Sequence, residues 1–93
     1  MKININFNGI SVLYKTLNKK KEIEFEFTGQ TLRDLITRLV GKFGTQMKDA
    51  LLNSSGDIDV EIRVTLNDTT NLGEDRMETI LNDGDTIAFA LGG

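Results

Sequence analysis

Four stretches of this sequence alternate apolar and polar residues, and the stretch between the second and third has the spacing of an amphipathic helix. Alternation places every second side chain on one face of a strand, whereas spacings of three and four define one face of a helix. Each predicted element is therefore apolar on one side only. The economical arrangement is a two-layer α+β domain, in which a mixed sheet of four or five strands packs on one long helix.

The predicted strands are KININF (2–7), EIEFEF (22–27), VEIRVTL (60–66) and TIAFAL (86–91). The first two are close in sequence, so we expect an antiparallel hairpin. Segment 10–21 between them is ambiguous, and fits either a ragged strand extension or a long hairpin arm. The residues expected to face the core in the last two strands are Val60, Ile62, Val64, Leu66, Ile87, Phe89 and Leu91.

The predicted helix begins after Thr31, which can cap it, and Asp34 is favourably placed against the helix dipole. Gly44 is well placed to end it. A second, short helix is expected at TQMKDALL (45–52), followed by a loop at 53–57. The apolar stripe of the long helix consists of Leu32, Leu35, Ile36, Leu39, Val40 and Phe43.

The remaining segments read as turns and irregular structure. Asn67-Asp68 and Asn82–Asp85 are turn signals, and Asn8-Gly9 is another. Segment 69–81 is irregular and predicts a short edge strand followed by a tight turn. Ninety-three residues are enough for a single domain, spanning 1–93, with a free Gly-Gly tail at its end.

Composition excludes several classes of function. Cysteine and histidine are both absent, which removes disulfides, zinc–thiolate sites, Cys or Ser–His nucleophiles and imidazole acid–base chemistry. We therefore expect no metal site. The net charge of −3 does not favour nucleic acid as a partner. No long apolar span and no signal-peptide core are present, so we expect a cytoplasmic protein without a membrane segment.

The charged clusters have ordinary structural interpretations. Glu22, Glu24 and Glu26 alternate along one strand, as expected for an edge that stays solvated rather than for paired catalytic acids. Asp83 and Asp85 flank a glycine and indicate a turn rather than a calcium loop. The lysines at 19–21 fit a solvated hairpin tip, without the interleaved aromatic residues that stack on bases.

The sequence ends in Gly92-Gly93, directly behind a predicted strand. A tail without side chains can enter a narrow channel and bring its α-carboxylate against a nucleotide phosphate. A carboxylate becomes a good acyl donor once ATP has converted it to an adenylate. This chain has no catalytic residues for that step, so a separate enzyme would perform it. The alternative interpretation is that the diglycine is incidental.

Taken together, KININF, GQTLRDLITRLVGKFG, VEIRVTLND, LNDGDTIAFA and the final GG resemble the MoaD/ThiS family of sulfur carriers. The resemblance covers nearly the whole chain and implies the ubiquitin-like β-grasp fold. It also implies a protein co-substrate rather than an enzyme, with no bound cofactor. A ubiquitin-activating-type enzyme of the MoeB/ThiF kind would use ATP to adenylate Gly93, with Gly92 as its slender neighbour. Sulfur from a persulfide would then replace AMP and leave a thiocarboxylate.

Two features favour the MoaD branch, whose acceptor is the large subunit of molybdopterin synthase, over the ThiS branch, which serves thiamin thiazole synthesis. Segment 45–57 is long enough for an extra helix, and TIAFA is similar to the MoaD pattern. One departure is that only Leu91 separates Ala90 from Gly92, which gives a free tail a reach of roughly 10 Å. A protein-modifier role, in which Gly93 joins a lysine amine, is the further alternative.

The resemblance also suggests a docking surface on the sheet face away from the helix. We expect partner contacts at Ala88, Ala90, Leu91 and Arg63, close to the tail. The alternative is an ordinary solvent face. The complete set of side chains expected on that face is Asn4, Asn6, Glu61, Arg63, Thr65, Thr86, Ala88 and Ala90.

Overall fold

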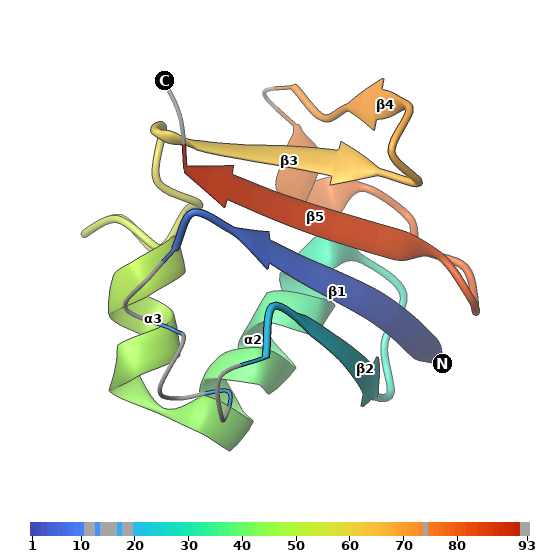
Figure 1. Cartoon of the computed structure of the whole chain (residues 1–93), viewed down its shortest axis with the longest axis horizontal. Helices are drawn as coiled ribbons and strands as arrows, with labels where there is room; N and C mark the ends of the chain where they lie inside the picture. The colour runs from blue at the N-terminus through green and yellow to red at the C-terminus, as the bar shows by residue number, and fades with distance from the viewer. Residues whose placement is uncertain (11–12, 14–16, 18–19, 74, 92–93) are drawn as a thin grey trace.

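A computed structural model of the chain describes residues 1–10, 13, 17, 20–73 and 75–91. Within these residues, five strands form one sheet in the order β2-β1-β5-β3-β4 (Figure 1). β1 and β5 are parallel and the other pairs are antiparallel, so the predicted mixed sheet is confirmed. The strands are β1 (Lys2–Asn8), β2 (Glu22–Glu26), β3 (Ile62–Leu66), β4 (Thr70–Asn71) and β5 (Thr86–Leu91).

The centre of the sheet is made by β1 and β5, and their alternating apolar residues point into the core. Ile3 and Ile5 are fully buried on β1, and Ile87 is fully buried on β5. Phe7 lies opposite Phe89 in the parallel register, and their rings stack with centroids 5.6 Å apart. The antiparallel hairpin of β1 with β2 is also confirmed, with Glu22, Glu24 and Glu26 exposed along the edge strand.

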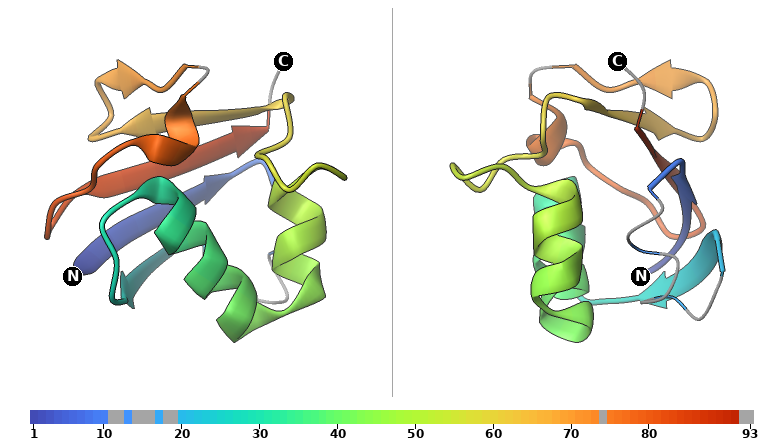
Figure 2. Two further views of the ribbon diagram at one scale, coloured as in Figure 1. Left: turned by 180° about the vertical axis from the view of Figure 1, so that it is seen from behind. Right: turned by 60° about the vertical axis from the view of Figure 1, so that its left-hand side comes forward.

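Two helices pack against one face of the sheet, as Figure 2 shows from behind. α2 (Leu32–Phe43) begins with a capping box, in which Thr31 accepts from the Asp34 N–H and Asp34 accepts from the Thr31 N–H. Gly44, at φ 80°, ends α2 and starts α3 (Thr45–Leu51). The long helix, its cap, its glycine stop and the short second helix are therefore confirmed.

Segment 69–81 forms β4 and then the 3-10 turn η1 (Arg76–Glu78), which agrees with the predicted short edge strand and turn. Segment 10–21 falls largely outside the described residues, so neither interpretation of it is decided. The described apolar members Ile10, Leu13 and Leu17 are buried in the core.

Two residues expected to face the core do not. Val60 is 88% exposed because β3 begins only at Ile62, and the chain before it forms a turn at Asp59. Leu91 is 52% exposed because it is the last residue of β5, where few neighbours remain to cover it. Both side chains lie at the same end of the sheet, since Ile62 pairs with Leu91.

Candidate functional site

Three of the predicted site residues, Arg63, Ala90 and Leu91, lie at the end of β5. Arg63 on β3 lies opposite Ala90, and Ile62 lies opposite Leu91, so the register brings these residues side by side. Gly92 and Gly93 lie outside the described residues. What the structure gives is the root of the tail, where β5 reaches the surface of the sheet at Leu91 (Figure 1).

The four predicted contact residues differ in accessibility. Ala88 is only 7% exposed, because Asn6 and Thr65 flank it in register on the two neighbouring strands. Ala88 therefore offers little surface of its own, and a partner contact there stays a prediction. Ala90 is partly exposed and Leu91 is half-exposed, so these two remain accessible.

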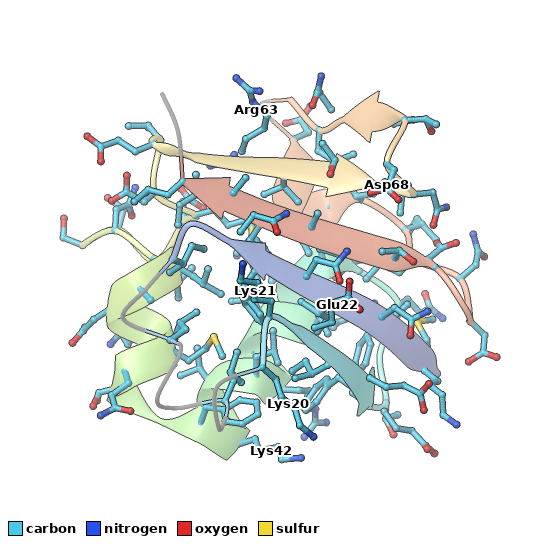
Figure 3. All side chains as sticks on the ribbon, viewed as in Figure 1. Lys20, Lys21, Glu22, Lys42, Arg63 and Asp68 are labelled. Atoms are coloured by element: carbon cyan, nitrogen blue, oxygen red, sulfur yellow. The ribbon has the colours of Figure 1, made fainter. Side chains whose placement is uncertain are left out.

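The Arg63 side chain is exposed and lies at the opposite end of the molecule from Lys20 and Lys42 (Figure 3). Among the described residues its guanidinium forms no hydrogen bond or ion pair. A guanidinium that is free of internal partners can bind a carboxylate or a phosphate with two parallel N–H donors. Arg63 is thus a cation available near the end of β5, opposite Ala90.

Gly9 is a further residue at the tail root, and the sequence indicated it only as part of a turn. Its φ of +73° lies in the left-handed region that favours glycine. A Cβ built on Gly9 would lie 3.4 Å from the Leu91 carbonyl oxygen. The tail root therefore lies between the turn after β1 on one side and Ile62 of β3 on the other.

The segment that leads into β3 is held by Arg76, which sequence reasoning missed. Its Nη1 donates to the Ile62 carbonyl at 2.6 Å, and its Nη2 donates to the carbonyls of Ile58 and Asp59, both at 3.0 Å. Burial lowers the pKa of Arg76, and the nearby carboxylates of Asp57 and Asp59 oppose that shift. The contacts reach 14 to 18 residues back along the chain, so no local pattern could have revealed them.

The acidic turn at Asn82–Asp85 uses its carboxylates internally, which agrees with the prediction of a turn. Asp83 accepts from the Lys2 N–H at 2.6 Å, and Asp85 accepts from the Asn82 N–H at 2.9 Å. Within the described ranges, no group of three or more acidic, histidine or cysteine side chains is arranged to hold a metal ion.

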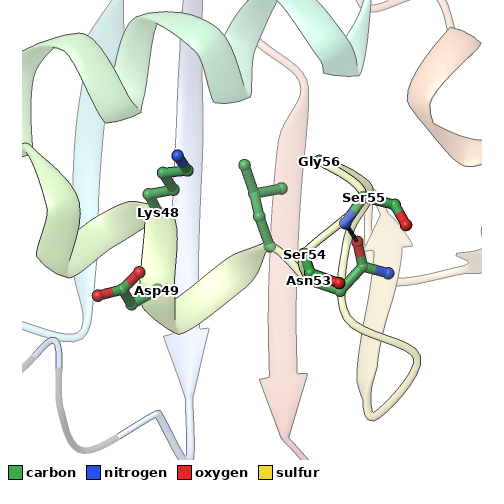
Figure 4. Close-up of a pocket in the computed structure, with 7 residues that line it drawn as sticks. Lys48, Asp49, Asn53, Ser54, Ser55 and Gly56 are labelled. Carbon is green, nitrogen blue, oxygen red and sulfur yellow. Dashed lines mark hydrogen bonds between the residues drawn. The ribbon is translucent and has the colours of Figure 1, made fainter.

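A hollow of about 420 Å³ at the end of α3 is a second candidate binding site (Figure 4). Its turn is closed by a bond from the Ser55 N–H to Asn53 Oδ1 at 2.9 Å. Lys48 and Asp49 point away from this turn, so the polar groups do not converge on one point. The end of β5 is therefore the better candidate, and its described side chains suit binding contacts rather than acid–base chemistry.

No protein-family model matches the sequence, and no curated protein matches it. The fold, in contrast, is shared with solved structures. CysO of Amycolatopsis orientalis, solved in a BexX/CysO complex, has 17% identity and a TM-score of 0.77, covering 98% of this chain and 96% of that one. The small archaeal modifier protein 1 of Haloferax volcanii has 14% identity and a TM-score of 0.76, covering 99% and 98%. Urm1 of Trypanosoma brucei has 24% identity and a TM-score of 0.73, covering 99% and 92%.

These similarities run the whole length of the chain and establish its fold, which is the ubiquitin-like β-grasp. The fold expected from the resemblance to the MoaD/ThiS family is thereby confirmed. None of the described helices is long and apolar enough to cross a membrane.

Proposed function

We propose that this chain is a ubiquitin-like sulfur carrier of the MoaD/ThiS type, and that its working group is a free α-carboxylate on Gly93. The observation that carries the proposal is the exit of β5. The strand leaves the core at Leu91, which is half-exposed, and Gly92 and Gly93 come next in the sequence. A tail with no Cβ atoms can enter a channel that would exclude any other residue.

The proposed chemistry has two steps, both on a partner enzyme of the ubiquitin-activating type. A carboxylate oxygen of Gly93 bonds to the α-phosphorus of ATP, and pyrophosphate leaves. The terminal sulfur of a persulfide then attacks the acyl carbon, AMP leaves, and a thiol reductant cleaves the S–S bond to release a thiocarboxylate. The chain itself provides a rigid scaffold and a narrow tail, so it acts as a co-substrate and binds no cofactor of its own.

Within this class we favour delivery of sulfur to molybdopterin synthase, with this chain as the small subunit beside the large one. The supporting observation is α3, which fills the segment that ThiS-like chains abbreviate. Delivery to thiazole synthase is the alternative within the same chemistry. In either case we place the protein in the cytoplasm, where such biosynthetic partners work.

A protein-modifier role is the second candidate, because one structural neighbour bears the name small archaeal modifier protein. In this role Gly93 would form an isopeptide bond with a lysine amine of a target. The solved BexX/CysO complex supports the broader expectation that a chain of this fold works bound to another protein.

The direct test is to incubate the purified chain with the ubiquitin-activating-type enzyme of its own organism, ATP and a persulfide donor, and to weigh the intact protein. We expect an adenylate first and then replacement of one oxygen by sulfur at Gly93. Deletion of Gly92 and Gly93 should abolish both products. Lys48→Ala, which changes an exposed side chain of α3, should leave them unchanged. An unmodified wild-type mass would reject the proposal.

Acceptor enzymes then separate the branches. Sulfur transfer to a precursor bound by the large subunit of molybdopterin synthase would support the favoured branch, and transfer to thiazole synthase would replace it. A diglycine remnant on target lysines in cell lysates would instead identify the modifier role.

A further inference from the structure

Val60 is an apolar side chain held in solvent by a built turn. The alternation of its strand predicts burial, yet the side chain is 88% exposed. The turn is closed by Asp59, whose Oδ1 accepts from the Glu61 N–H at 2.9 Å and whose carbonyl accepts from the Ile62 N–H at 3.0 Å. Arg76 binds the same segment from behind. Such a set of bonds fixes Val60 in place rather than leaving it on a loose loop.

Two hollows adjoin at Val60. One, of about 680 Å³, is also lined by Asp75 and by η1. The other, of about 490 Å³, extends to Arg63 and Asn71 at the sheet edge. Both are lined by Val60, Leu72 and Arg76, so the two are adjacent, and together we call them the Val60–Leu72 groove.

The groove lies next to the tail root. Val60 is two residues from Ile62, and Ile62 pairs with Leu91. Two extended residues and one strand spacing put the Val60 and Leu91 Cα atoms within about 13 Å of each other. Of the three exposed large apolar side chains in the described part of the chain, Val60 and Leu91 share this end, and Ile80 lies elsewhere.

Four carboxylates and three guanidinium groups line the groove, and of the guanidinium groups Arg63 alone has no partner among the described residues. Arg33 is already paired with Glu78 at 2.9 Å, and the Arg76 guanidinium is engaged by three carbonyls. Glu61 and Asp75 line the groove without an ion pair among the described residues. The exposed Val60 side chain, beside the unpaired carboxylates of Glu61 and Asp75, complements a surface on which Lys or Arg surrounds an apolar side chain.

We propose that the Val60–Leu72 groove is a second contact surface for the adenylating enzyme that acts on Gly93. The enzyme places an apolar side chain against Val60 and basic side chains opposite Glu61 and Asp75. This inference rests on the proposed function, and it adds that recognition takes place at the groove as well as along the tail. A short tail alone offers little area for specific binding, and the groove provides the remainder.

The test measures the KM of the adenylating enzyme for this chain by ATP–pyrophosphate exchange. Val60→Ser should raise KM about tenfold with little change in kcat, as expected for the loss of an apolar anchor. The double variant Glu61→Lys, Asp75→Lys should raise KM as well and remove most of its dependence on salt. Matched controls are Ile80→Ser, an exposed apolar residue away from the groove, and Asp49→Lys on α3. Both should retain the wild-type KM.

Thermal melts must show that Val60→Ser folds as the wild type does, which its exposure leads us to expect. If both groove variants keep the wild-type KM while loss of Gly92-Gly93 abolishes exchange, the inference is wrong and the proposed function stands. Equal effects of Ile80→Ser and Val60→Ser would also overturn it. Should the wild-type chain support no exchange at all, the proposed function fails and this inference fails with it.

Discussion

The two ends of β5 differ in how they are held. The first residue of the strand accepts support from side chains of other segments, whereas the last residue has backbone neighbours. The Thr86 N–H donates to Asn67 Oδ1 at 2.8 Å, and Asn67 Nδ2 donates to Asp85 Oδ1 at 3.1 Å. The Asp85 carbonyl also accepts from the Asn4 N–H at 2.9 Å. At the far end, Leu91 pairs with Ile62 and lies close to Gly9, and no side chain of the described residues makes a hydrogen bond to it.

This contrast separates anchoring from presentation. The Asn82–Asp85 turn and the turn at Asn67 fix where β5 begins, and the sheet then fixes its direction. Nothing comparable in the described residues encloses Leu91, so the segment that follows starts from a defined point on the surface. The proposed carrier role requires this combination of a rigid base and an accessible end.

Phe89→Ala should have the largest effect, because it removes the ring that stacks on Phe7 in the middle of β5. We expect the free energy of unfolding to fall by about 3–5 kcal/mol, which is a large part of the stability of a domain of this size. Urea unfolding followed by circular dichroism measures it. Leu91→Ala at the exposed end should cost less than about 1 kcal/mol, and equal costs would refute the contrast.

Arg76→Met should come next, with a loss of about 2–3 kcal/mol, because the Ile58, Asp59 and Ile62 carbonyls lose a charged donor. Hydrogen exchange should quicken at the Ile62 amide and stay near the wild-type rate at Thr86. Arg76→Lys serves as the matched control with a smaller loss. Uniform quickening along β5 would show that the two ends are not independent.

Asn67→Ala should cost about 2 kcal/mol, since it removes two side-chain hydrogen bonds and puts alanine, which tolerates left-handed backbone less well than asparagine, at a φ of 53°. Asn67→Gly loses the same bonds but tolerates the backbone, so its cost should be about half as large. Both variants should loosen the start of β5 and leave amide exchange at Leu91 unchanged. A change at Leu91 alone would contradict the assignment of the anchor.

Asp34→Asn should have the smallest effect and serves as a reference outside β5. Backbone N–H groups of Gln30 and Thr31 hold the pKa of Asp34 below its ordinary value of 3.8. A carboxyl whose pKa is lower in the folded state stabilises the fold at pH values above its unfolded-state pKa. That stabilisation is lost as the pH falls through the folded-state pKa. The stability difference between wild type and variant should therefore be present at neutral pH and vanish in acid. A difference that grows in acid would contradict the shift.

Much of the fold followed from local patterns. Three features depend on residues that are close in sequence and could therefore be predicted from it. They are the capping box at Thr31, the helix end at Gly44 and the alternation of β1 and β5. The strand order did not, because pairing β1 with β5 joins the two ends of the sequence.

The site was predicted less completely, for identifiable reasons. The alternation of 60–66 extends through Val60, but the turn at Asp59 removes that residue from the strand. The pattern put Ala88 on the sheet face but could not show how far its neighbours on both sides of a central strand cover it. Arg76 lies in a segment without periodicity, and only the folded chain shows what it binds. The roles of Gly92 and Gly93 remain predictions.

The parallel pairing of β1 with β5 has a mechanical consequence. A force applied at Leu91 along β5 would load its hydrogen bonds to β1 and to β3 in shear, all at once, because the strand has a partner on each side. Hydrogen bonds between strands that are loaded in shear must break together rather than one after another. A partner that pulls on the tail along β5 would thus load the sheet in the direction in which strand separation needs the largest force.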